Sequence, residues 1–169
     1  MINQRAMNKP DYIMAIDPDC DKSGVAWLEM IDKSVSLFSL TFPELVDKLI
    51  NGRGQIPKTL VVVEAGWLNR SHWHLTKFDS KQKAAAKGNA VGRNHETGRK
   101  IVEMARYHGI EVKEQTPLRK VWRGPDGKIT HEELSQFIPG LPNRTNQEVR
   151  DAALLAWNEA GFPIRVKVK

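Results

Sequence analysis

The sequence has few cysteines and no long apolar segment. Its 169 residues include a single cysteine, Cys20, which excludes an internal disulfide and a cysteine-rich zinc site. No apolar run approaches the roughly 18 residues that a transmembrane helix needs. The opening residues, MINQRAMNKP, lack the apolar core of a secretory signal. We therefore expect a cytoplasmic protein without membrane attachment.

The composition is typical of one folded domain. Hydrophobic residues make up 40% of the chain and charged residues 27%, as in ordinary globular proteins. The length fits one domain that buries about two-thirds of its unfolded surface without disulfides or structural metals. We expect a flexible leader at residues 1–10, a folded domain at 11–162 and a short basic tail at 163–169.

Positive charge is concentrated in the middle of the sequence. Residues 65–130 contain 14 Lys and Arg against 6 Asp and Glu, a net charge of +8, whereas residues 1–64 carry −2 and residues 131–169 are neutral. Clustered Lys and Arg favour nucleic-acid contact because they displace the counterions of the phosphates. A helix with a solvated basic face is the alternative.

The hydrophobic pattern predicts a mixed-sheet α/β domain. Short apolar or alternating runs predict strands at 12–17, 23–30, 34–42, 59–65 and 110–115. Helices are predicted from Pro43 to Asn51-Gly52, at about 91–107, at 131–138 and at about 145–160. Residues 66–88 lack a clear period, which predicts a long functional or mobile loop. Thr130-x-x-Glu133 and Thr145-x-x-Glu148 are expected to be capping boxes of the last two helices.

Three carboxylates occupy positions that suit a buried apolar residue. Asp17 ends an apolar strand, Glu64 follows Leu60–Val63 in another, and Asp151 precedes the run AALLAW. A buried carboxylate costs several kcal/mol unless it is paired or binds a cation. Each one alone also fits pairing with a nearby Arg or capping of a turn. Glu148, three residues before Asp151, projects from the same face of the last predicted helix.

Carboxylates without His or Cys partners indicate hard cations. Mg²⁺ and Mn²⁺ prefer oxygen ligands, and two such ions about 3.5–4 Å apart promote phosphodiester hydrolysis. Acidic ligands beside a strongly basic segment therefore predict a metal-dependent nuclease. Asp17, Asp19 and Asp21 have the spacing of a calcium loop, but Lys22 occupies the position where such a loop needs glycine.

Four segments resemble the RuvC-type Holliday junction resolvases, a family with the RNase H-like fold. They are IDPDCDKSGVAWLE, LVVVEAGW, GRNHETGRKIVEMARYHGIEV and QEVRDAALLAW, in this order across nearly all of residues 11–160. The resemblance implies a five-stranded mixed sheet, with a three-strand antiparallel meander plus two parallel strands, flanked by helices. It also implies a homodimer that acts on branched DNA.

The resemblance assigns roles to individual residues. Asp17, Glu64, Glu148 and Asp151 would be catalytic metal ligands for two Mg²⁺ ions, with Mn²⁺ as a substitute, and Glu148 replaces the more usual Asp or His. Lys120 and the catalytic Lys128 would lie near the scissile phosphate. Trp67 would probe the junction centre, although packing within the fold is an equal alternative.

The basic, aromatic stretch predicts the DNA contacts. Trp73, with His72 and His74, is a candidate for stacking on unpaired bases. His72 and His74 alone are too few for a zinc site, and a plain loop explains them. The expected DNA-binding residues are Trp67, Arg70, Trp73, Lys77, Lys81, Lys83, Lys87, Arg93, Lys120 and Arg123.

These inferences predict a Mg²⁺-dependent crossover junction endodeoxyribonuclease of DNA recombination and repair. It would cut four-way junctions or related branched DNA symmetrically by a two-metal mechanism. An RNase H-like nuclease acting on RNA or RNA–DNA hybrid is one alternative. A module that binds branched DNA without cutting is another, and the four filled acidic positions argue against it. The chain is too short for the two duplicated domains of an actin-like ATPase.

Overall fold

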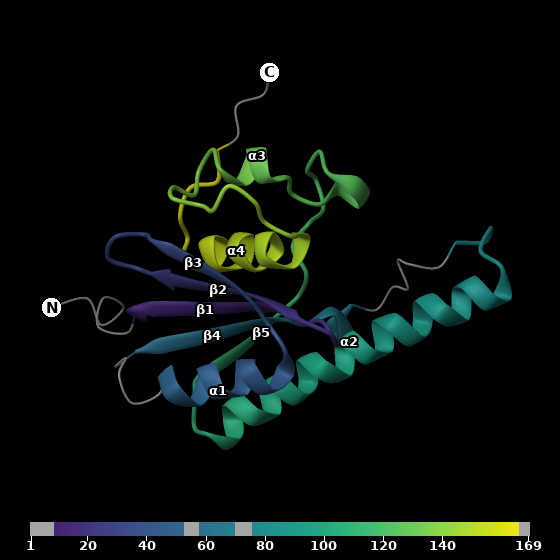
Figure 1. Ribbon diagram of the computed structural model, residues 1–169, viewed down its shortest axis with the longest axis horizontal. Coiled ribbons are helices and arrows are strands. Elements are labelled where there is room, and N and C mark those ends of the chain that lie inside the picture. Colours follow the sequence, from purple (N-terminus) through teal and green to yellow (C-terminus); the bar gives the residue numbers. More distant parts are fainter. Residues whose placement is uncertain (1–8, 53–57, 70–75, 166–169) are drawn as a thin grey trace, which may run out of the picture.

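A mixed five-stranded sheet forms the centre of the molecule (Figure 1). The computed structural model describes residues 9–52, 58–69 and 76–165. The strand order is β3-β2-β1-β4-β5, with antiparallel β1–β2 and β2–β3 pairs and parallel β1–β4 and β4–β5 pairs. This arrangement confirms the predicted fold class, a meander plus two parallel strands in an RNase H-like sheet. The strands are β1 (Tyr12–Asp17), β2 (Ser23–Glu29), β3 (Val35–Leu40), β4 (Thr59–Glu64) and β5 (Val112–Gln115).

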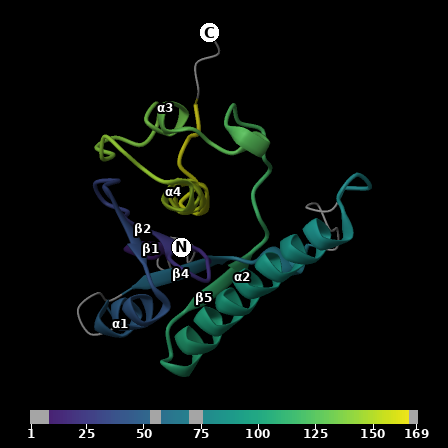
Figure 2. The ribbon, with the colours of Figure 1, turned by 45° about the vertical axis from the view of Figure 1, so that its right-hand side comes forward.

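Helices cover both faces of the sheet. α1 (Phe42–Gly52) and α2 (Lys81–Tyr107) lie on one face and α4 (Gln147–Glu159) on the other, while the short α3 (His131–Leu134) lies beyond α4 (Figures 1 and 2). Within the described residues, the single-turn 3-10 helices η2 (Gly66–Leu68) and η3 (Pro125–Gly127) interrupt the connections. Within the described residues, no helix combines the length and apolar character needed to cross a bilayer.

Alternation along the central strands gives the sheet two apolar faces. In β1, Ile13 and Ala15 belong to the cluster that contains α4, whereas Met14 and Ile16 belong to the cluster with α1 and α2. Successive strand side chains point to opposite faces, and all four residues are buried. The near-continuous apolar runs of β1 and β4 therefore follow from helix coverage on both sides.

α4 is buried between the sheet and the segment that contains α3. Its residues from Ala152 to Trp157 are all buried. On the side away from the sheet, Trp122 stacks on Phe137 with ring centroids 6.2 Å apart, and both pack against the cluster around α4. Contacts on two sides fix the position of α4, and its first turns lie at the candidate site described below.

The predicted loop at 66–88 is wrong in part, because α2 begins at Lys81 rather than near Val91. The hydroxyl of Ser80 caps the helix by accepting a hydrogen bond from the Lys83 amide. Three alanines, 84–86, follow in the first turns and are the strongest helix formers. The apolar period is absent from these turns because they extend beyond the sheet and are largely exposed (Figure 1).

One predicted capping box is confirmed and the other is wrong. Thr130 and Glu133 form both bonds of the motif at α3. At α4, however, the cap is Asn146, whose side chain accepts from the Val149 amide at 3.0 Å. Asn and Thr are both favourable N-cap residues, so the sequence pattern did not distinguish Thr145 from Asn146 as the cap. The third predicted helix, 131–138, is regular only over His131–Leu134.

Candidate active site

Two carboxylates lie side by side at one edge of the sheet. Asp17 ends β1 and Glu64 ends β4. These strands are parallel, and the register pairs Ile16 with Val63, one residue earlier in each strand. Because the carboxyl ends of neighbouring parallel strands meet at one edge, both side chains line the same pocket.

Asp151 comes to this pocket from α4 because glycine lets the helix approach the sheet. Gly24 on β2 is the antiparallel partner of Asp17. A Cβ atom at Gly24 would overlap the main-chain carbonyl of Glu148, in the first turn of α4. The missing side chain therefore allows close packing and places Asp151, one turn further along, beside Asp17 and Glu64.

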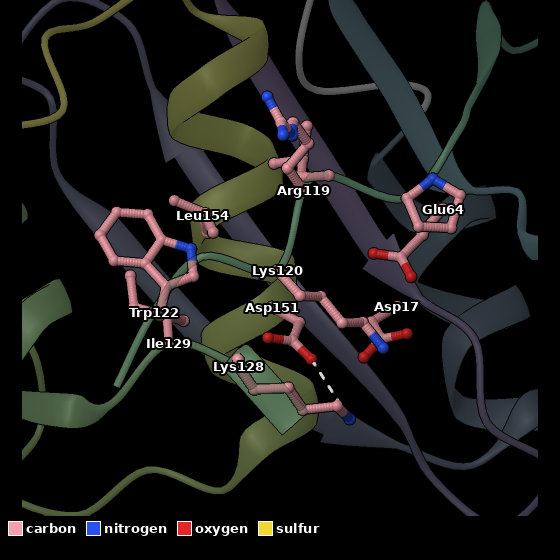
Figure 3. Close-up of a pocket in the computed structure, with 12 residues that line it drawn as sticks. Asp17, Glu64, Arg119, Lys120, Trp122, Lys128, Ile129, Asp151 and Leu154 are labelled. Atoms are coloured by element: carbon pink, nitrogen blue, oxygen red, sulfur yellow. Dashed lines mark ion pairs between the residues drawn. The ribbon is translucent and has the colours of Figure 1, made fainter. Parts of the chain in front are cut away.

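The pocket combines three carboxylates with basic side chains. Figure 3 shows the carboxylates of Asp17, Glu64 and Asp151 directed toward the same space from three elements, with Lys120 and Lys128 reaching toward it. Lys128 Nζ lies 3.7 Å from Asp151 Oδ2, and the Asp151 side chain is 19% exposed. The other lining residues are Pro117, Leu118, Arg119, Trp122, Gly127, Ile129 and Leu154.

The carboxyl groups in the pocket have raised pKa values. Burial, followed by the charges of Glu64 and Asp151, raises the pKa of Asp17 well above its ordinary value. Burial and Asp151 raise the pKa of Glu64 to about 7, and burial also raises the pKa of Asp151. Lys128 opposes all three increases. Burial is thus the main cause in each case, because it disfavours the ionised form of a carboxyl group.

A hydrogen-bond network that sequence reasoning missed orients Asp151. Gln147 Nε2 donates to Asp151 Oδ1 at 2.7 Å, and the Gln147 amide oxygen accepts from Arg150 at 2.8 Å. The Arg150 side chain also donates to the Ile129 carbonyl at 3.1 Å. The i, i+4 spacing of Gln147 and Asp151 was the sequence signal for this contact.

The donor set of the pocket fits hard divalent cations. Asp17, Glu64 and Asp151 offer carboxylate oxygens, without His or Cys among the lining residues, as Mg²⁺ and Mn²⁺ prefer. A bound dication would favour their ionised forms and so oppose the effect of burial, which raises their pKa values. Among the four predicted ligands, all of them in the described part of the chain, no three have carboxylate oxygens that lie within 4.8 Å of one another. Binding of one ion by three of them therefore requires side-chain movement.

Glu148 stands apart from the other three predicted ligands. It is half-buried in the first turn of α4 and does not line the pocket. Its charge nevertheless contributes to the raised pKa of Asp17. The structure thus groups Asp17, Glu64 and Asp151 closely and leaves Glu148 at the periphery.

The turn after β1 contains a second acidic group. Ligand atoms of Asp19, Cys20 and Asp21 lie within 4.8 Å of one another. The Asp19 carboxylate already accepts hydrogen bonds from the Asp21 amide at 2.8 Å and from Asn94 at 3.2 Å. These bonds explain the cluster as the turn between β1 and β2, which contacts α2 through Asn94.

No family model matches this sequence, and no curated protein matches it. Among solved structures, the chain is similar to T. thermophilus RuvC in complex with Holliday junction substrate. The identity is 11% and the TM-score is 0.45, over 89% of this chain and 96% of that chain. Values this low do not transfer the activity of that protein to this one.

The predicted DNA-binding lysines differ in their surroundings. The N-terminal half of α2 extends past the sheet (Figures 1 and 2) and carries Lys81 on an exposed position. Lys83 and Lys87 instead contact Asp79 at 3.3 and 2.8 Å. These bonds hold the pKa of Asp79 well below its usual range, so this carboxylate neutralises part of the basic surface.

The remaining basic candidates among the described residues lie on α2, beside it or in the segment after β5. Lys77 is exposed, with its Nζ 5.3 Å from the centre of the Phe78 ring. Arg93 lies 4.0 Å from Asp21, an exposed pair. Lys120 lines the pocket, whereas the exposed Arg123 does not. Arg70 and Trp73, like His72 and His74, lie outside the described residues.

Trp67 is packed within the fold. Its indole N–H donates to Glu114 on β5 at 3.1 Å, and Arg99 lies 5.6 Å from its ring centre. A Cβ atom at Gly98 of α2 would overlap the ring, so glycine makes this contact possible. These contacts agree with the packing alternative, while a role at a DNA junction stays a prediction.

Proposed function

We propose that this protein is a Mg²⁺-dependent endonuclease that resolves Holliday junctions or related branched DNA. The observation that carries the proposal is the pocket in which Asp17, Glu64 and Asp151 meet Lys120 and Lys128. Clustered carboxylates with raised pKa values are typical of sites that bind metals or transfer protons. The resemblance of the sequence to RuvC-type resolvases supports the choice of substrate.

In this proposal, Asp17, Glu64 and Asp151, with Glu148 beside them, hold two Mg²⁺ ions. Bound metal would activate a water and stabilise the leaving oxygen of a phosphodiester. The lysines have a separate role. Lys120 and Lys128 border the carboxylates and would attract the scissile phosphate to the pocket. As the resemblance implies, the products would carry a 5′-phosphate and a 3′-hydroxyl.

The basic surface of α2 would hold a DNA arm outside the pocket. Lys81 and Arg93 are exposed on this helix, and exposed basic residues along a helix suit the phosphates of a duplex. Symmetric cutting of a four-way junction needs two active sites, so we propose a homodimer as the active form in DNA recombination and repair.

A cleavage assay tests the proposal directly. Purified protein is incubated with a four-way junction, a linear duplex of the same sequence, an RNA–DNA hybrid and single-stranded RNA, in Mg²⁺, Mn²⁺ or EDTA. We expect paired cuts in the junction with either metal and none in EDTA. Preferred cutting of the hybrid or RNA would replace the substrate assignment. Binding of the junction without cutting in either metal would contradict the enzymatic proposal.

Asp17→Asn tests the site. The variant keeps the shape of the side chain and removes one buried negative charge, so we expect the fold and junction binding to persist while cutting is abolished. Asp11→Asn is the matched control, because Asp11 is exposed immediately before the same strand. Normal cutting by the Asp17 variant would show that the carboxylate pocket is not the active site.

Sedimentation of the protein with and without junction tests the homodimer. We expect two protomers on each junction that is cut on both strands. A single protomer on a junction that is still cut in both strands would contradict the dimeric mechanism.

A further inference from the structure

The segment that carries Lys120 and Lys128 is a closed loop. The Trp122 amide donates to the Gly127 carbonyl at 3.0 Å, and the Gly124 amide donates to the Lys128 carbonyl at 2.9 Å. Gly127 has a φ of 72°, which favours glycine, and a Cβ atom there would lie 2.7 Å from the Lys120 carbonyl oxygen. The two arms of the loop, Lys120–Gly124 and Gly127–Thr130, are therefore in close contact near both lysines.

A buried carboxylate in α3 forms hydrogen bonds to both arms of this loop. Glu133 in α3 is 5% exposed. On one arm, its Oε1 accepts from the Arg123 amide at 3.1 Å. On the other arm, its Oε2 accepts from the amide and the hydroxyl of Thr130 at 3.0 and 3.1 Å. A buried charge is tolerated when it accepts several such bonds.

These contacts exceed what a helix cap requires. A capping box involves only the Thr130 and Glu133 pair, whereas the bond to Arg123 reaches ten residues back along the chain. Glu133 thereby fixes the arm that follows Lys120 relative to the arm that follows Lys128. Both lysines line the carboxylate pocket, and Glu133 does not.

We propose that Glu133 is a positioning residue, which sets the placement of Lys120 and Lys128 against the carboxylates Asp17, Glu64 and Asp151. The inference rests on the proposed nuclease function for its catalytic consequence. Sites need support from such buried contacts because misplacement of a group by about 1 Å can cost 100-fold in rate. Glu133 acts through the loop and touches no substrate.

Glu133→Gln is the first test. It keeps the size of the side chain but replaces one accepting oxygen with an NH₂ group, which would face the N–H donor of Arg123 or Thr130. We expect cutting of saturating junction to slow by roughly 10- to 100-fold, with the junction Kd changed by less than about twofold. Glu111→Gln is the matched control, since it removes the same charge from an exposed position. Equal loss in both variants, or a loss confined to Kd, would overturn the proposal.

A double-mutant cycle separates positioning from general damage to the fold. The cycle adds Glu133→Gln to a protein that already carries Lys120→Ala and Lys128→Ala, and cleavage is followed for hours under single-turnover conditions. We expect Glu133→Gln to slow cleavage by this background very little, because the effects of residues that act together are not additive. If Glu133→Gln slows this background by the same factor as wild type, Glu133 does not act through the lysines.

Amide hydrogen exchange gives a readout without cleavage. In Glu133→Gln we expect the amides of Arg123 and Thr130 to exchange at least about tenfold faster, with α4 unchanged. Unchanged protection would overturn the proposal even if cutting is slower. If the wild type cuts no nucleic acid, the proposed function fails and the exchange result alone decides the positioning role. Should Glu133→Gln not fold, Glu133→Asp, with its shorter reach, replaces it in each assay.

Discussion

Asp17 and Gly24 are directly opposite each other in the antiparallel β1–β2 pair. Asp17 lines the carboxylate pocket, and Gly24 packs against the main chain of α4 at Glu148. The β1–β2 pair thus supplies a candidate metal ligand, Asp17, and at Gly24 the space that lets the helix carrying Asp151 come close to Asp17.

Gly24→Ala should separate α4 from the sheet. The added methyl group would overlap backbone, which cannot rotate away, so we expect a loss of about 1–3 kcal/mol in the free energy of unfolding. Gly88→Ala is the matched control, because that site on α2 is open and alanine should stabilise the helix by about 0.5–1 kcal/mol. Thermal and urea unfolding measure both. A Gly24 variant as stable as wild type would contradict the close contact.

The metal-free protein should lose stability as pH rises. The pKa of Glu64 is raised from its ordinary value of 4.5 to about 7 in the fold. The folded state therefore binds the proton more tightly than the unfolded chain does, and this contribution is lost as pH rises from about 4.5 through 7. Asp17 and Asp151 act in the same direction. Melting temperatures in EDTA across this range test the prediction.

Glu64→Gln supplies the control for this pH dependence. The amide does not ionise, so the fall in melting temperature between pH 5 and pH 8 should be smaller than in wild type. Mg²⁺ should raise the melting temperature of wild type more at pH 8 than at pH 5, because it binds the ionised carboxylates. An identical pH profile in the variant would show that Glu64 has an ordinary pKa.

Removal of Lys128 should tighten metal binding. Its ammonium lies 3.7 Å from Asp151 Oδ2 and opposes the carboxylate charge that attracts a dication. Such a partly exposed pair is worth about 0.2–1 kcal/mol, so Lys128→Ala should bind Mn²⁺ up to about fivefold more tightly while cutting more slowly. Titration calorimetry with Mn²⁺ measures the affinity. Lys100→Ala, which removes a charge from the exposed surface of α2, should bind Mn²⁺ like wild type.

Lysines on α2 should contribute unequally to DNA binding. Lys81→Ala should reduce the slope of log Kd against log salt by about 1, because an exposed lysine releases a counterion from the phosphates. Lys87→Ala should change it less, because its ammonium is already paired with Asp79 at 2.8 Å. Binding titrations of a four-way junction at several salt concentrations compare the two. Equal slopes in both variants would contradict a neutralising role of Asp79.

Local patterns in the sequence were sufficient for most of the sheet and failed at helix boundaries. The apolar runs at 12–17 and 59–65 predicted β1 and β4 to within one residue, since strands buried on both faces have a strong signal. The start of α2 was missed because its exposed turns have no apolar period. The cap of α4 was misassigned because Thr145 and Asn146 are both suitable caps.

The fold class and the unusual status of Asp17, Glu64 and Asp151 followed from the sequence, because apolar periodicity and a carboxylate in an apolar context are local properties. That these three residues share a pocket, with Glu148 at its edge, became evident in the folded molecule. It also showed Gln147 holding Asp151 and Glu133 joining the arms of the basic loop. These relationships depend on strand register and helix approach, which arise from contacts between residues far apart in the chain.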